Sequence, residues 1–323
     1  MAYSSGSTID AGDYNGFRNR LNQIIGFGTE NGGSGGNSGY GQTNTIAAVA
    51  ATNTITATQW SNLFTRLRST MNHQGSTVTL AAGNPATGDT IAIKTGLDTD
   101  LTTANTNRMN AAAASLASAV NISGVNGTAR TSSWNGAISH VFTVTFAASG
   151  AAPAGAGAQD AARFFFNSGG YINIGITGSN GSSSQDTAWS NLLSAMGTIR
   201  FGGSGTTKSG GSGSPSTLAT SLGYHSLTTS NQLIFRQYDS TANYTANLVE
   251  LYVRSDTVTD PNSRGGKGSV LTFTLTLNDT HSNVFFDTVA LDVTTACSYV
   301  GNNTTYLNNV PWTITGATTT SWA

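Results

Sequence analysis

The strongest constraint on the fold is a strict alternation of apolar residues and threonines between residues 270 and 278. The apolar members are Leu271, Phe273, Leu275 and Leu277, and the residues between them are Thr272, Thr274 and Thr276. Successive side chains of a β-strand point to opposite faces, so this pattern buries one face and leaves threonine hydroxyls on the other. It predicts a half-buried strand in a sheet with one covered face.

Similar segments begin at about residue 136 and are joined by loops rich in Gly, Ser and Asn. They predict strands at 138–146, 162–167, 171–177, 198–201, 232–238, 248–254, 270–278 and 288–294. One helix is expected to interrupt them, near 186–196. This arrangement predicts an antiparallel β-sandwich over residues 136–323.

The first 75 residues predict two short amphipathic helices instead. Asp10 is placed as the N-cap of the first helix, with Asp13 in its first turn, where the helix dipole favours a carboxylate. Thr56 and Gln59 have the spacing of a capping box for the second helix, and Gly75 is a plausible stop for it. The glycine-rich stretch 32–42 between the helices lacks the Lys-Ser/Thr of a phosphate-binding loop and is expected to be a flexible connector.

Three regions follow from these patterns, and together they predict a mainly β protein that is α+β overall. Residues 1–75 form a helical docking module, and 76–135 form an Ala/Thr-rich connecting region with a helix within 97–120 that includes Ala111 to Ala114. Residues 136–323 form the sandwich.

The two N-terminal helices are the expected docking interface, because short amphipathic helices are marginally stable alone. Each carries one apolar stripe and two arginines, for which a solvated helix flank is an equal alternative. The expected interface residues are Tyr14, Phe17, Arg18, Arg20, Leu21, Trp60, Phe64, Arg66 and Arg68.

No catalytic, cofactor-binding or metal site is predicted. The four histidines are far apart in sequence, and the single cysteine, Cys297, has no second cysteine near it at a metal-ligand spacing and is expected to be buried. His140 is expected in the core, and His73 beside a helix C-terminus is expected to complement the helix dipole. Glu250 is expected to pair with Arg254 on the polar face of a strand.

Three remaining groups leave alternatives open. Asp98 and Asp100 have too few ligands around them for a calcium loop. A hydrolase would need two carboxyls flanking a bond, for which Asp279, Asp287 and Asp292 are weak candidates. Loop aromatics that could contact a glycan are Tyr224, Tyr299, Tyr306, Trp312 and Trp322.

Charge also limits the functional classes. Charged residues are 9% of the chain, against roughly 25% in ordinary domains, and the formal net charge is -1. This balance argues against nucleic acid or an anionic membrane as a partner and is compatible with assembly, because self-repulsion is weak. The polar N-terminus predicts no secretory signal, and no apolar run has the length of a membrane-spanning helix.

Several segments of the chain form a recognisable pattern: Asp13-Tyr14-Asn15, Gly26, Gly39-Tyr40-Gly41-Gln42, Ile55-Thr56-Ala57, Gln59-Trp60-Ser61-Asn62-Leu63, the run from Ala162 to Gly170, and the run from Thr187 to Leu193. In these segments the chain resembles virion structural or tail-fibre-like proteins of tailed bacteriophages, especially cyanophages. The sequence departs from the family pattern at Tyr171, where a charged residue is expected.

The resemblance implies a non-enzymatic particle component without cofactors, made in a host cytoplasm and located in the virion. A tail, neck or fibre-associated protein is expected, with other copies of itself, as a trimer, and neighbouring phage proteins as partners. A head decoration or cement protein is one alternative, and a module that binds a host receptor or surface glycan is another.

Overall fold

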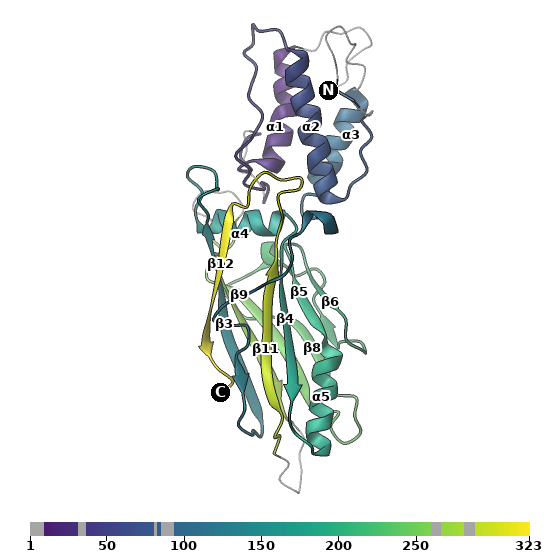
Figure 1. Ribbon diagram of the computed structural model, residues 1–323, viewed down its shortest axis with the longest axis vertical. Coiled ribbons are helices and arrows are strands. Elements are labelled where there is room, and N and C mark those ends of the chain that lie inside the picture. Colours follow the sequence, from purple (N-terminus) through teal and green to yellow (C-terminus); the bar gives the residue numbers. More distant parts are fainter. Residues whose placement is uncertain (1–9, 32–36, 81–82, 85–93, 260–265, 281–287) are drawn as a thin grey trace.

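The protein is elongated, with a module of three helices at one end and a body of two β-sheets below it (Figure 1). The computed structural model describes residues 10–31, 37–80, 83–84, 94–259, 266–280 and 288–323. Each part has its own cluster of buried apolar side chains. The predicted mainly β, α+β architecture is confirmed.

The helical module consists of α1 (Ala11–Ile25), α2 (Ala57–Gln74) and α3 (Lys94–Thr106). The first two begin as predicted: Asp10 and Asp13 form a reciprocal capping box, and so do Thr56 and Gln59. Gly75 ends α2 in the left-handed conformation, with a φ of +70°, which a residue without Cβ adopts at no steric cost.

The helix expected within 97–120 is shorter than the sequence suggests. α3 ends at Thr106, and the alanine run contributes only a 3₁₀ turn, Ala113–Ser115. The amide of Ala112 donates to the carbonyl of His73 at 2.7 Å, at the end of α2. High helix propensity is therefore overridden by a tertiary hydrogen bond.

The two sheets are antiparallel and pack face to face, as predicted for a sandwich. In spatial order, the first contains β1 (Val120–Asn121), β11 (Asp292–Val300), β4 (Tyr171–Ser179), β5 (Thr198–Phe201) and β6 (Thr206–Ser209), with β2 (Ala129–Arg130) also paired to β11. The second contains β12 (Trp312–Thr320), β3 (Ala137–Ala148), β10 (Val270–Asn278), β9 (Leu248–Ser255), β8 (Gln232–Tyr238) and β7 (Thr217–Leu218).

Strand β10 lies at the centre of the second sheet and shows the predicted alternation. Its leucines and Phe273 are fully buried between the sheets, whereas its threonines are half-buried on the outer face. Phe273 stacks on Phe142 of β3 with ring centroids 5.4 Å apart. The period-two pattern therefore sets which face of the sheet is covered.

The strand predicted at 162–167 is wrong, because this segment belongs to helix α4 (Ala158–Asn167). A short apolar run does not separate a strand from a buried helix, and here Asp160 caps the helix by accepting from the amide of Gly157 at 3.0 Å. Helix α4 lies across the end of the sandwich that faces the helical module (Figure 1). The predicted inserted helix is confirmed as α5 (Ser184–Met196), beside the sheets.

The strand predicted at 288–294 begins later, at Asp292, and runs on to Val300. Strand β12 was not predicted, because Trp312–Thr320 mixes Thr, Gly and Ala without a clear apolar face.

Regions 76–135 and 32–42 also differ from a simple connector. The first contributes α3 to the helical core and β1 and β2 to a sheet.

In the glycine-rich stretch, residues 32–36 lie outside the described residues, but Ser38, Tyr40 and Gln42 are buried at the junction of the two parts. The loop between β11 and β12 enters the helical module, where Leu307 joins the core. The segment from 37 to 42 is thus a packed element of the junction and not a free connector.

Candidate functional site: an open hollow around Arg254

The apolar residues expected at a docking interface lie inside the helical module. Their side chains are at most 7% exposed, and Trp60 contacts Tyr14 edge-to-face at 5.2 Å. They are Tyr14, Phe17, Leu21, Trp60 and Phe64. The two helices and α3 bury their stripes on one another, so these five residues form a core and are not exposed to a partner.

The four arginines of the same helices all have partners within the chain. Arg20 forms an ion pair with Asp98 at 2.6 Å, and Arg18 donates to the carbonyl of Ile46 at 2.7 Å. Arg66 donates to the side chains of Asn44 and Asn308, and Arg68 donates to the side chain of Asn84. A docking role for these arginines stays a prediction.

The described carboxylates considered for metal or hydrolytic chemistry accept hydrogen bonds within the chain. Asp98 pairs with Arg20, whereas Asp100 accepts from the amides of Thr79 and Leu80. Asp279 accepts from Gln185 at 2.8 Å, and Asp292 accepts from Asn180 at 2.5 Å. Asp287 lies outside the described residues. Within the described ranges, no three His, Cys, Asp or Glu side chains are grouped to hold a metal ion.

Two of the four histidines, His140 and His73, are buried in the structure. His140 is fully buried, as predicted; it lies 2.7 Å from the hydroxyl of Thr295 in the other sheet and 3.0 Å from the hydroxyl of Thr318 on the neighbouring strand β12. His73 is also fully buried, and its Nε2 lies 3.2 Å from the carbonyl of Ser168. Burial lowers the pKa of His73 to about 4, so it is neutral and does not complement the helix dipole as a cation.

The aromatics considered for glycan contact are mostly in the core. Tyr224 stacks on Phe166 at 4.6 Å, and Trp322 is 1% exposed. Trp312 packs edge-to-face on Phe165 at 4.9 Å. Tyr299 and Tyr306 are half-buried. The buried rings of Tyr224, Trp312 and Trp322 cannot contact a ligand on the surface. They therefore do not support glycan binding.

The expected ion pair between Glu250 and Arg254 is wrong, and Arg254 is instead part of a separate site. Residues four apart on a strand are about 13 Å apart, whereas directly opposed residues on neighbouring strands have Cβ atoms about 5 Å apart. Glu250 is opposite Arg236 on β8, and their side chains form an ion pair at 2.5 Å. Arg254 is left exposed and has no hydrogen-bond or ion-pair partner among the described residues.

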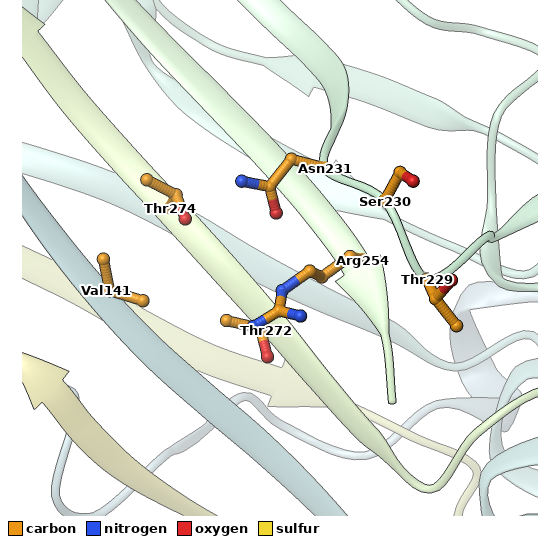
Figure 2. A pocket seen from close by; sticks show the side chains of 7 residues that line it. All are labelled: Val141, Thr229, Ser230, Asn231, Arg254, Thr272 and Thr274. Atoms are coloured by element: carbon orange, nitrogen blue, oxygen red, sulfur yellow. The ribbon is translucent and has the colours of Figure 1, made fainter. Parts of the chain in front are cut away.

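The guanidinium of Arg254 lies in an open hollow of about 620 Å³ on the outer face of the second sheet (Figure 2). The lining comes from three neighbouring strands and from the loop that precedes β8. Its residues are Val141, Thr229, Ser230, Asn231, Arg254, Thr272 and Thr274.

Strand register places these side chains together. Thr272 of β10 is opposite Arg254 of β9 on one side and Thr143 of β3 on the other, and Thr274 is opposite Val141. All of them alternate with buried residues and therefore share the outer face. In Figure 2 the side chain of Asn231 extends over the sheet toward Arg254.

The hollow carries the positive charge of Arg254, and its polar side chains are available to a ligand. Among the described residues, no carboxylate lines it and no intramolecular hydrogen bond engages the side chains of Asn231, Thr272 or Thr274. Two smaller hollows, of about 280 and 340 Å³, differ in this respect. Their charged groups, Glu30 and Arg66, are already hydrogen-bonded to amides and asparagines. The Arg254 hollow is therefore the better binding site.

Comparisons with protein-family models, with curated proteins and with solved structures found no match for this chain. Among the helices of the described residues, none combines the length and the hydropathy needed to cross a membrane.

Proposed function

We propose that this chain is a non-enzymatic structural subunit of a tailed-phage virion, associated with the tail, neck or fibres. The proposal starts from the sequence resemblance described above. The observation that carries it is the buried polar junction, which joins the helical module and the sandwich into one extended body. A subunit that has to hold other proteins at fixed positions needs such a connection.

The junction contains hydrogen bonds from both sides. Gln42 donates to the carbonyl of Asn309 at 3.1 Å and accepts from the amide of Asn308 at 2.6 Å. Ser69 of α2 donates to the carbonyl of Tyr306 at 2.6 Å. These partly buried hydrogen bonds are directional, and leaving one unmade away from water is costly, so they oppose bending between the two parts.

The surface chemistry supports assembly. The outer face of β10 carries threonines, and only 9% of all residues are charged. Copies of such a protein repel one another weakly, and a closed trimer would remain soluble through hydroxyl and amide groups. Docking to a neighbouring particle protein would use the polar outside of the helical module, since its apolar stripes are buried.

Two measurements on the full chain test this proposal. Antibodies raised against the recombinant protein should label purified particles of the phage that encodes it, at a fixed place, and absence of the chain from such particles would refute the virion role. Light scattering should give the mass of a trimer. A monomer that still binds particles would instead favour the head decoration or cement alternative.

A further inference from the structure

We propose that the hollow around Arg254 binds a saccharide that carries a carboxylate. This proposal does not depend on the virion role, because the site lies within one chain and its binding can be measured on the purified protein. Its volume of about 620 Å³ falls within the roughly 300–1,000 Å³ that is common for small-molecule sites.

The charge of the site selects an anion. Arg254 is exposed and unpaired among the described residues, whereas Arg236 on the neighbouring strand is neutralised by Glu250. A guanidinium presents a planar fork of donors that matches the two oxygens of a carboxylate. Because no acidic side chain among the described residues lines the hollow, a bound carboxylate meets no repulsion from that lining.

The neutral part of the lining selects a polyhydroxylated ligand. Thr272 and Thr274 contribute hydroxyls from β10, and Asn231 contributes an amide from the opposite rim (Figure 2). Hydroxyls and amides both donate and accept, as sugar hydroxyls do, so each can exchange a hydrogen bond with a ring substituent. The methyl groups of Val141 offer a small apolar contact for the C–H face of a ring.

The same features disfavour other anions. Nucleic acid is held by many cationic contacts along its backbone, and this hollow contains one. A small anion such as acetate would use the guanidinium and leave the amide and the hydroxyls without a ligand. A saccharide with one carboxylate engages the whole lining.

The test is a binding titration of the full chain with trigalacturonate and with 3′-sialyllactose, followed by nuclear magnetic resonance. Maltotriose and lactose serve as neutral controls, and acetate serves as the control for a simple anion. We expect saturable binding of at least one acidic saccharide, with a shift of the Arg254 Nε–H signal. We expect much weaker binding of the neutral sugars and of acetate.

Two matched variants locate the site. Arg254→Gln should weaken acidic-saccharide binding by about tenfold or more, because it removes the charge-assisted pair. Arg200→Gln removes an arginine from β5 in the opposite sheet, where it lies 5.2 Å from the Tyr171 ring, and should leave binding unchanged. Circular dichroism of both variants checks that they fold.

The opposite results overturn the proposal. The proposal is wrong if neither acidic saccharide shows saturable binding. It is also wrong if Arg254→Gln and Arg200→Gln lose saccharide binding to the same extent. Binding that is unchanged in Arg254→Gln would place the saccharide elsewhere. Equal affinity for acetate would reduce the site to an anion contact, and equal affinity for maltotriose or lactose would remove the role of the carboxylate.

Discussion

Arg163 and Asp160 form a buried ion pair at 2.8 Å on helix α4, at the junction of the helical module and the sandwich. The side chain of Arg163 is 0% exposed and that of Asp160 is 6% exposed. Arg163 also donates to the carbonyl of Phe27 at 2.9 Å and to the carbonyl of Ser38, while its guanidinium lies 4.8 Å from the Phe164 ring. One side chain of the sandwich part thus satisfies two carbonyls from the segment after α1.

Arg163→Met should destabilise the protein by about 3–5 kcal/mol, because it leaves the Asp160 carboxylate buried without its partner. Urea unfolding measures the loss. Arg200→Met is the control, since that arginine is half-buried, lies 5.2 Å from the Tyr171 ring and has no ion pair among the described residues, so its loss should cost at most about 1 kcal/mol.

Adding Asp160→Asn to Arg163→Met should give a loss smaller than the sum of the two single losses, because the double variant contains no isolated buried charge. Strict additivity of the two changes would show that the pair is not coupled and would contradict this account of the junction.

Gly41→Ala should disturb the same junction through the backbone. Gly41 has a φ of +68°, and a Cβ there would lie 2.4 Å from the ring of Phe164. Gly136→Ala is a matched control, because Gly136 has a φ of +84° but open space around the position of a Cβ. We expect a cost of about 1–2 kcal/mol at Gly136 and about 1–3 kcal/mol more at Gly41. Equal thermal shifts in the two variants would argue against tight packing of this loop on α4.

Acid should destabilise the fold before the carboxylates titrate. Burial lowers the pKa values of His73 and His140 to about 4, from an ordinary value of 6.5. Between these values the unfolded chain binds protons that the folded chain does not, so stability falls as the pH falls from about 6.5 to 4. Each histidine can contribute roughly 3 kcal/mol to this loss.

Denaturant unfolding at pH 7, 5.5 and 4.5 measures this slope. His73→Gln should have a shallower pH dependence, because one of the two groups no longer titrates. An unchanged slope in this variant would show that His73 is not the group responsible.

Cys297 should be inert in the folded protein. It is 1% exposed, and burial raises the pKa of its thiol, so little thiolate is present near neutral pH. A disulfide reagent should therefore react slowly in native buffer and quickly in urea, with Cys297→Ala as the blank. Rapid reaction of the native protein, or a disulfide-linked dimer on a non-reducing gel, would favour an interchain bridge.

The elements that the sequence predicted well are those encoded by local pattern. The capping boxes at Asp10 and Thr56 and the alternation around Phe273 depend on neighbouring residues, and the structure contains all three. Helix α4 was mistaken for a strand because its side chains are buried on every side at the junction. The short apolar run Phe164-Phe165-Phe166 does not by itself separate a strand from a buried helix, and the polar residues Asp160, Arg163 and Asn167 are buried beside it.

The sequence by itself therefore determined the sandwich, the capped helices and the threonine face, since each follows from side-chain order along one segment. Only the tertiary structure decided that the stripes of α1 and α2 bury one another, that Arg163 joins the two parts, and that Glu250 pairs with Arg236, which leaves Arg254 without an ion pair among the described residues. These outcomes depend on which residues the strand register and helix packing bring opposite one another, and that information is spread over distant segments of the chain.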